Sequence, residues 1–575
     1  MSDDTQTLPL NFLKSADSVI RNQSLGAATS LIDYHSEGQC LVIAPVELAL
    51  SLAEELAPLK VTVLDTTDGA SGQRPGKRLT AEGIAVYSGG RPAVTGHLGA
   101  FSVTFADGDR VHDLAVMETL ATGCFDLVLD TSDPPLVEAR LPPFGYRAVP
   151  VPDATSEPVT PQLQERLLEV TAEFKELIGD FDKPRYFDYN AGICAHQRSR
   201  LSGCTNCIDI CATGAIRTSG EGVEVDPYLC QGCGSCATVC PTGAMTYAYP
   251  RASDAISRTR EMLDKHTGDC SILLLYRQSE EDADVQFEST LPEFVLPVAV
   301  EEVTAFGIDY WASMLAAGLN HIVLYLPTEV TATDSHPVDG DDSEQMALEH
   351  QASILHRILE GLGLDQCGVQ RVTEPADLNP RLHALNGPVR EAGPGFATHD
   401  NKRQTFRTAI DALASGHPAR SDTVDLPEHS PFGTLLVNKE ACTLCMACVS
   451  TCPAAALLDG QDMPKLRFIE ASCVQCGLCA QACPESAIEL QPSYRYDSVA
   501  AREIVTLNEE EPFNCVRCHK PFATRKMIDT MSAKLAGHWM FGDEQAVRRL
   551  KMCEDCRVVD IFESDASGIQ VHRDD

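Results

Sequence analysis

The chain has 575 residues, which is too long for one hydrophobic core, and its 44% hydrophobic and 22% charged residues are ordinary for a globular protein. Its 83 acidic and 45 basic residues give a net charge of −38, which argues against binding to nucleic acid or docking on an anionic membrane. The acidic surface either is simply well hydrated or docks a basic redox partner, and charge alone does not separate these interpretations. No apolar run is long enough for a membrane helix, and the acidic N-terminus has no export signal, so we expect a cytoplasmic protein.

The 24 cysteines are the strongest compositional signal. Most of them lie two or three residues apart in clusters, within a large chain that we expect to stay in a reducing cytosol. Such clusters indicate metal binding rather than disulfides. Four further cysteines lie in or beside apolar stretches and are expected to be buried thiols: Cys40, Cys124, Cys270 and Cys367.

Residues 1–150 are predicted to form a Rossmann-like α/β domain that lacks the dinucleotide-binding fingerprint. We expect strands at 40–44, 61–65, 101–107 and 125–130 and an amphipathic helix at 45–56. The first strand and the helix are joined by "APVE" rather than by G-x-G-x-x-G, so close approach to a pyrophosphate is not supported. Residues 151–183 are predicted to be a linker followed by a helix.

Residues 184–250, the first cysteine region, contain one complete cysteine motif and one irregular motif. The complete motif has the spacing C-x2-C-x2-C-x3-C: Cys230, Cys233, Cys236 and Cys240. The irregular motif keeps only its last three positions: Cys204, Cys207 and Cys211. Leu201 stands where the first cysteine is expected, and the nearest upstream cysteine is Cys194, at the start of a nine-residue spacer. Gly192 and Gly203 give both ends of that spacer the freedom to turn back toward the vacant position.

Residues 268–375 are predicted to form a second α/β domain, with strands at 271–276, 294–300 and 321–326 and helices at 309–318 and 344–363. Two segments, "LPVAVEEVTAFGIDYWASMLAAGLNHIVLYL" and "ILEGLGLDQCGVQRVT", resemble the delta-subunit family of methyl-viologen-reducing hydrogenases. That family passes electrons into heterodisulfide reductase complexes and holds a [2Fe–2S] centre with several cysteines. Because only Cys270 and Cys367 lie near, the resemblance implies the scaffold without that centre. Residues 376–430 are expected to be an irregular linker.

Residues 431–492, the second cysteine region, carry two complete C-x2-C-x2-C-x3-C-P motifs. A [4Fe–4S] cube has four iron corners that each take one thiolate, and three cysteines spaced by two residues wrap one face of it. The fourth cysteine points toward the other cube, so each cube takes three ligands from one motif and one from the other. The first predicted set is Cys442, Cys445, Cys448 and Cys483. The second predicted set is Cys473, Cys476, Cys479 and Cys452.

The second cysteine region resembles the bacterial two-cluster ferredoxins, and the first cysteine region is predicted to be a second module of that kind. Its predicted ligand sets are Cys194, Cys204, Cys207 and Cys240, and Cys230, Cys233, Cys236 and Cys211. The alternative is a three-cysteine site that holds [3Fe–4S] or no cluster, with Cys194 a buried thiol. The basic residues of the spacer, His196, Arg198 and Arg200, form either a docking contact or a solvated loop.

Residues 500–575 are predicted to be a helical tail with a four-cysteine zinc site. Two C-x2-C pairs suit tetrahedral coordination: Cys515, Cys518, Cys553 and Cys556. The alternatives are a further iron–sulfur centre or a covalent haem, because "CVRCH" matches the attachment motif C-x-x-C-H. Haem attachment takes place outside the cytosol, so we prefer zinc.

The expected protein is therefore a multidomain α/β and α+β electron carrier with sixteen cysteines on four [4Fe–4S] clusters and four cysteines on zinc. The sequence shows no nucleophile–base pair, so a stand-alone catalyst is not predicted. The layout of the whole chain resembles multi-cluster ferredoxin-like proteins associated with formate dehydrogenases, which implies a formate dehydrogenase as the redox partner. Two alternatives stay open: a reductase whose N-terminal domain binds flavin or NAD(P)H, and a maturation or assembly scaffold for a metallo-oxidoreductase.

Overall fold

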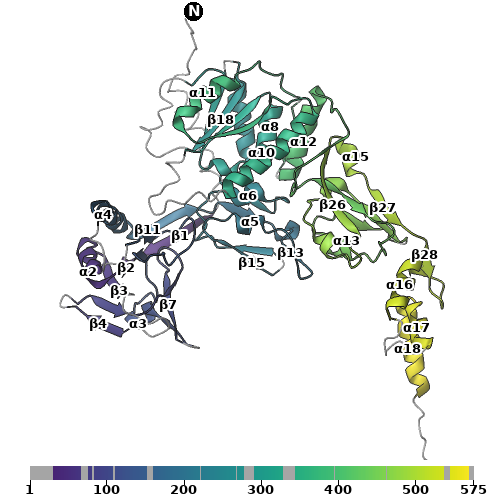
Figure 1. Ribbon diagram of the computed structural model, residues 1–575, viewed down its shortest axis with the longest axis horizontal. Helices are drawn as coiled ribbons and strands as arrows, with labels where there is room; N and C mark the ends of the chain where they lie inside the picture. Colours follow the sequence, from purple (N-terminus) through teal and green to yellow (C-terminus); the bar gives the residue numbers. More distant parts are fainter. Residues whose placement is uncertain are drawn as a thin grey trace, which may run out of the picture.

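The computed structural model describes residues 30–65, 76–80, 83–107, 110–151, 160–220, 222–266, 269–277, 291–327, 343–393, 395–399, 401–461, 463–535 and 544–568. Residues 1–29 of the expected N-terminal domain and 152–159 of the expected linker lie outside these ranges. The described chain is a mixed α/β multidomain protein (Figure 1). The first cysteine region lies between an N-terminal body (30–176) and a central body (252–416), and the second cysteine region lies beside it and carries the tail at its far side (Figure 1).

The sheet of the N-terminal body is covered on both faces. Its strand order is β10–β9–β2–β3–β5–β4, and all neighbouring pairs are parallel except β4 with β5. One face packs against α2 and α4, and the other packs against α3 and the three-stranded meander β6–β7–β8. The elements are β2 (Gln39–Ile43), α2 (Val46–Glu55), β3 (Lys60–Asp65), β4 (Gly76–Leu79), β5 (Ala85–Ser88), β6 (Ala93–Thr95), β7 (Ser102–Asp107), β8 (Arg110–Asp113), α3 (Leu114–Glu118), β9 (Leu127–Asp130), β10 (Tyr146–Ala148) and α4 (Pro161–Glu176).

Two features of this body differ in detail from the sequence-based expectation. The strand expected at 101–107 is β7, which belongs to the meander and not to the main sheet. The antiparallel ribbon of β1 (Leu31–Ser36) and β11 (Gly179–Pro184) lies outside the main sheet and leads the chain into the first cysteine region. Residue Lys183 on this ribbon reaches a cysteine loop, as described below.

The central body has a parallel four-stranded sheet in the order β19–β18–β20–β21. Each strand contributes side chains to two apolar cores, because successive side chains of a strand point to opposite faces of the sheet. Leu273 and Leu275 pack in the core that contains α8, α10 and α12, whereas Ile272 and Leu274 pack with α11. The elements are α7 (Ala252–Lys265), β18 (Ile272–Arg277), β19 (Val295–Val300), α8 (Ile308–Ala316), β20 (His321–Tyr325), α10 (Ser343–Gly361), β21 (Gly368–Val372), α11 (Pro375–Leu385) and α12 (Lys402–Gly416).

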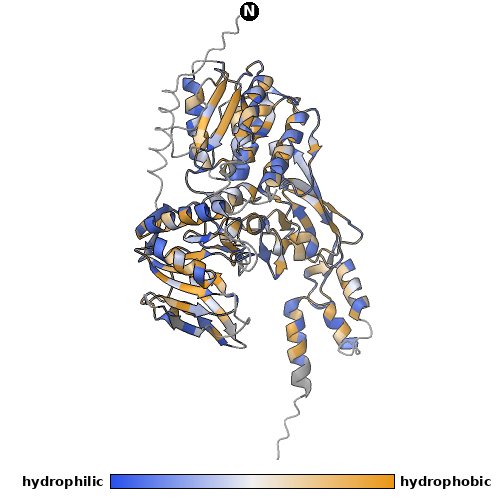
Figure 2. Ribbon diagram, turned by 60° about the vertical axis from the view of Figure 1, so that its left-hand side comes forward, coloured by the Kyte–Doolittle hydropathy of each residue, from blue (hydrophilic) through white to orange (hydrophobic). Residues whose placement is uncertain are grey.

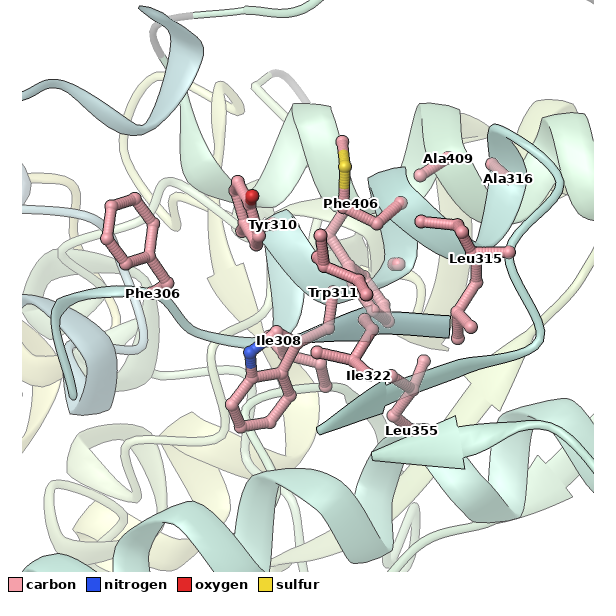
Figure 3. Packing of buried hydrophobic residues seen from close by; sticks show 14 of the residues in the cluster. Phe306, Ile308, Tyr310, Trp311, Leu315, Ala316, Ile322, Leu355, Phe406 and Ala409 are labelled. Carbon is pink, nitrogen blue, oxygen red and sulfur yellow. The ribbon is translucent and has the colours of Figure 1, made fainter. Parts of the chain in front are cut away.

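Helix α12 gives order to part of the expected linker at 376–430. It packs along α8, and Figure 3 shows Phe406 and Ala409 of α12 near Trp311, Leu315 and Ala316 of α8. Trp311 is fully buried in this core. The segment that was expected to be irregular is therefore part of the packed central body.

Short antiparallel strands frame the two cysteine regions. The first region contains β12 (Phe187–Tyr189) with β17 (Met245–Tyr247) and β15 (Ile216–Ser219) with β16 (Gly222–Val225). The second region takes part in the sheets β22–β26–β23 and β24–β25–β27, whose strands β22 and β27 lie outside residues 431–492. The strands are β22 (Thr423–Asp425), β23 (Gly433–Val437), β24 (Leu457–Asp459), β25 (Lys465–Phe468), β26 (Ile488–Arg495) and β27 (Val505–Glu509).

The tail begins beyond the second cysteine region and is mostly helical. Its elements are α15 (Ser498–Arg502), β28 (Pro512–Asn514), β29 (Pro521–Thr524), α16 (Arg525–Leu535), α17 (Glu544–Leu550) and α18 (Glu554–Gly568). Figure 2 shows that apolar residues gather on the strands and on the inward helix faces of the two bodies. Within the described residues, none of the helices has the length and apolarity required to span a membrane.

Candidate metal centres

The loops of the second cysteine region bend through left-handed residues before each short helix. Met446 (φ 61°) precedes α13 (Ala447–Thr451), and Gly477 (φ 79°) precedes α14 (Leu478–Gln481). Leu444 and Gln475 also have positive φ, which is costly for residues with a Cβ. Repeated left-handed turns curl each loop tightly, which is how three cysteines two residues apart come to face one interior point.

Two pockets open inside these curled loops. One is lined by Cys442, Cys445, Cys448 and Cys483. The other is lined by Cys473, Cys476, Cys479 and Cys452. Each pocket thus takes three cysteines from one loop and one from the end of the other short helix. These are the groupings that the spacing predicts, and the binding of iron by them stays a prediction.

Burial and mutual proximity raise the pKa values of thiols in these loops. Burial raises the pKa of Cys448 to about 12, and the neighbouring thiols Cys442, Cys445 and Cys483 add to the effect. A metal centre supplies the positive charge that such a set of thiolates needs, so binding must release protons. The Cys483 Sγ also accepts the Ala487 N–H at 3.3 Å.

The nine-residue spacer of the first cysteine region folds into a closed hairpin. Strands β13 (Gln197–Arg198) and β14 (Leu201–Ser202) pair around Ser199 and Arg200, both at positive φ, as in a two-residue type I′ turn. At its base, the Cys204 N–H donates to the Ala195 carbonyl at 2.9 Å. The hairpin therefore returns the chain so that Cys194 and Cys204 lie at neighbouring positions despite their separation in sequence.

Cys194 lies near Cys204, Cys207 and Cys240, which are the other members of its predicted ligand set. Burial raises the pKa of Cys207 to about 12, and Cys240, Cys204 and Cys194 are the nearby thiols that raise it further. The cysteines of the other set also lie near one another. Burial is the main cause that raises the pKa of Cys233 to about 12, and the nearby thiols Cys211 and Cys230 add to the effect. The structure thus brings together both predicted sets of the first cysteine region.

His196 of the spacer is a buried structural residue and not a docking contact. Its ring Nδ1 lies 2.9 Å from the Cys204 carbonyl oxygen, which can only accept, so Nδ1 carries the proton. Its Nε2 shares a hydrogen bond with the Thr218 hydroxyl at 3.0 Å. Both ring nitrogens are satisfied within the region, and His196 fastens the hairpin to β15.

Gly203 is required for close packing rather than for turning. A Cβ at this position would lie 2.4 Å from the Ala195 carbonyl oxygen and 3.0 Å from Cγ of Leu478. The turn that was expected from Gly192 and Gly203 is made instead by Ser199 and Arg200. Arg200 is exposed at the tip of the hairpin.

The tail cysteines form a tighter group than those of the two cysteine regions. Among the described residues, one group of potential metal ligands has all of its ligand atoms within 4.8 Å of one another: Cys515, Cys518, Cys553 and Cys556. Zn–S bonds of about 2.3 Å give a tetrahedron with S–S edges of about 3.8 Å. The Cys518 and Cys553 sulfurs are 3.7 Å apart. This donor set fits a single ion such as zinc, whereas the wider cysteine sets of the two regions fit a larger inorganic core.

The pKa values of two tail cysteines shift in opposite directions, and burial is the main cause that raises the pKa of Cys556 to about 12. Burial tends to raise the pKa of Cys515, but backbone N–H groups of Cys518, Cys553 and Arg517 lower it to about 6. The Arg517 N–H donates to the Cys515 sulfur at 3.4 Å. One ligand of this site is thus prepared as a thiolate by its own loop.

The remaining cysteines lie apart from these groups. Cys40, Cys270 and Cys367 are buried, as expected for structural thiols, and Cys124 is only partly buried and donates to the Gly99 carbonyl at 3.2 Å. Sequence reasoning missed the cations that reach the cysteine loops, among them Lys183 and Arg403. Lys183 donates to the Cys230 carbonyl at 2.6 Å, and Arg403 donates to the Cys473 carbonyl at 2.7 Å. Both are far from these loops in sequence, so no local pattern announces them.

Comparison with known families agrees with this geometry. Residues 202–244 match a family model described as a 4Fe-4S dicluster domain, and residues 441–488 match a second model of the same description. The chain therefore contains two ferredoxin-like dicluster domains, which together imply four [4Fe–4S] clusters. Cys194 lies outside the first matched segment. A search among curated proteins finds no match to the chain.

Proposed function

We propose that this protein relays electrons through four [4Fe–4S] clusters to or from a partner oxidoreductase. The observation that carries the proposal is the assembly of four sets of four cysteines, of which all but Cys194 lie inside the two segments that match dicluster domains. A [4Fe–4S] cluster bound at such a site exchanges one electron at a time without breaking a bond. The function is thus electron transfer rather than group transfer.

The protein residues contribute ligation, burial and hydrogen bonds. The last cysteine of three motifs accepts a backbone N–H from a residue four or five positions on: Cys240 from Met245, Cys452 from Ala456 and Cys483 from Ala487, each at 3.3 Å. Such bonds favour the more negative state of a thiolate-ligated centre. Four of the eight cysteines in the second cysteine region are buried, which limits contact of the centres with water.

The tail is proposed to hold one structural zinc ion through Cys515, Cys518, Cys553 and Cys556. Its β29 lies against the loop of the second cysteine region, where the Thr524 hydroxyl donates to the Thr443 carbonyl at 3.3 Å. Zinc would therefore fix the tail beside the pocket of Cys442 and Cys445.

The metal content of anaerobically purified protein tests this proposal. We expect about sixteen irons and about one zinc per chain, with EPR signals of reduced [4Fe–4S] clusters. About eight irons would contradict the four-cluster function, and about twenty irons without zinc would contradict the assignment of the tail.

The partner is proposed from the resemblance of the chain to proteins of formate dehydrogenase systems. The test is to mix the oxidised protein anaerobically with a formate dehydrogenase and formate. Bleaching of the visible iron–sulfur absorption, dependent on both additions, is expected. No bleaching, with dithionite still able to bleach the protein, would exclude that enzyme as the donor.

A further inference from the structure

The two cysteine regions touch through one ligand loop of each. Strand β14 of the spacer hairpin lies against helix α14, and Gly203 packs so closely on Leu478 that a Cβ there would come within 3.0 Å of it. Gly203 precedes Cys204, and Leu478 follows Cys476 by two residues. The contact thus joins the Cys194 set of the first region to the Cys473 set of the second region.

Arg403, the second residue of α12, joins the same two loops. Its guanidinium donates to the carbonyl of Pro241, the residue after Cys240, at 3.3 Å. It also donates to the carbonyls of Cys473 at 2.7 Å and Ala471 at 3.4 Å. A fourth bond to the Pro431 carbonyl at 2.6 Å and a position 4.6 Å from the ring centre of Phe432 hold the side chain in place.

We propose that the four centres form a single row in which the Cys194 set and the Cys473 set are the adjacent inner pair, and that Arg403 is a positioning and tuning residue shared by that pair. The row runs from the Cys230 set through the two inner sets to the Cys442 set. This inference rests on the proposed electron-transfer function and deepens it, because it names where an electron crosses between the two dicluster domains.

The physical basis for tuning is the fixed positive charge of Arg403. Reduction adds one negative charge to a centre, and a nearby cation in a poorly screened interior favours that added charge. Because Arg403 lies at ligand backbones of both inner sets, it should raise the reduction potentials of both inner centres. One electron then leaves the reduced member of a neighbouring pair and enters the oxidised one, and no proton or bond is exchanged.

The order of the row is tested by removing one centre at a time from the full-length protein. Cys476→Ala disables an inner set, and Cys445→Ala is the matched change in the outer Cys442 set. In partly reduced protein, the EPR signal of the Cys194-set centre should lose the part of its spin–spin broadening that comes from the Cys473-set centre in Cys476→Ala and should keep its full broadening in Cys445→Ala. Equal narrowing in both variants, or narrowing in Cys445→Ala alone, would overturn the proposed order.

The tuning role is tested by Arg403→Gln in an anaerobic redox titration followed by EPR. At a fixed ambient potential, the ratio of reduced to oxidised inner centres should fall roughly tenfold, which is 59 mV for one electron. The matched control is Arg467→Gln, because Arg467 belongs to the same region and donates to the Asp459 carbonyl within its own hairpin. That control should leave all four potentials unchanged.

Arg403→Lys separates charge from packing, because lysine keeps the charge but not the fork of donors. It should restore most of the inner-centre ratio that Arg403→Gln loses. Unchanged inner ratios in Arg403→Gln, or an equal fall in all four centres, would overturn the tuning role. These outcomes differ from failure of the proposed function, in which wild-type protein would lack about sixteen irons.

Discussion

In the second cysteine region, Cys473 follows the 3-10 turn η3 (Glu470–Ser472) with φ −67° and ψ 131°. In the first cysteine region, Cys194 follows the 3-10 turn η1 (Ala191–Ile193) with φ −69° and ψ 134°. The two backbones are nearly identical, yet the next cysteine comes three residues later in one region and ten residues later in the other. The comparison shows that the position of a first ligand is set by its own turn, and that the following spacer can lengthen if it closes on itself.

The two cysteine regions also differ in which side chain from another part of the fold binds their loops. Lys183 from the ribbon of the N-terminal body donates to the Cys230 and Tyr228 carbonyls, and lies 5.0 Å from the ring centre of Tyr34. Burial lowers the pKa of Lys183 to about 8. Arg403 from the central body fills the comparable role at Cys473. Each region is thus fixed by a cation that belongs to another part of the fold.

The largest effect is expected from Cys194→Ala, which tests whether Cys194 and Cys473 are equivalent ligands. If Cys194 matches Cys473 in function as in backbone, this change should convert one [4Fe–4S] centre to [3Fe–4S] or remove it, with a loss of about one to four irons per chain. Iron analysis and EPR measure the result. Cys124→Ala, outside all cysteine groups, is the control and should keep the full iron content. Wild-type spectra in Cys194→Ala would show that the turn equivalence has no role in ligation.

A smaller effect is expected from Gly203→Val. The new side chain meets the Ala195 carbonyl and Leu478, so the hairpin base must open at a cost of about 1–3 kcal/mol. The measurement is the denaturant midpoint for loss of the iron–sulfur absorption. Gly192→Ala is the matched control, because its nearest neighbour is the Asn190 side chain at 3.2 Å, which can move. Equal midpoints for the two variants would contradict the close-packing role of Gly203.

The smallest expected effect concerns the tip of the hairpin. Arg200 has φ 65°, where glycine is unstrained, so Arg200→Gly should stabilise the hairpin by up to about 1 kcal/mol. Arg198→Gly removes the same charge from strand β13 and should destabilise it by about 0.5–1 kcal/mol. The same denaturation assay should therefore give shifts of opposite sign. Shifts of the same sign would argue against the type I′ turn.

The sequence reveals the features that depend on neighbouring residues. Cysteine spacing predicts which side chains share a pocket, because three of each four lie in one curled loop. Apolar patterns likewise predict β2, β3 and the central strands, whose burial follows from their own residues. The hairpin base could be anticipated from Cys194 and Cys204, but not the turn at Ser199 and Arg200, which carries no glycine or asparagine signal.

Features that depend on distant residues could not be read in this way. Helix α12 was hidden in a segment with proline, glycine and aspartate, and its order comes from packing against α8. Arg403 gains its role from carbonyls more than 25 residues away on either side, which no local pattern encodes. The strand at 102–107 pairs with β6 and β8 because of the chain path, not because of its composition.

Helix α12 ties the spacing of the two dicluster domains to the hydrophobic core of the central body. Its first turn holds Arg403 between the domains, while Phe406 and Ala409 on the same helix are packed near Trp311 (Figure 3). Electron tunnelling weakens steeply with distance, so a small displacement of this helix changes the rate of exchange between the domains. On the proposed function, packing in the central body therefore sets the distance between the two dicluster domains. A cavity made at Trp311, which is far from every predicted ligand in sequence, should then change the rate of electron transfer between the domains.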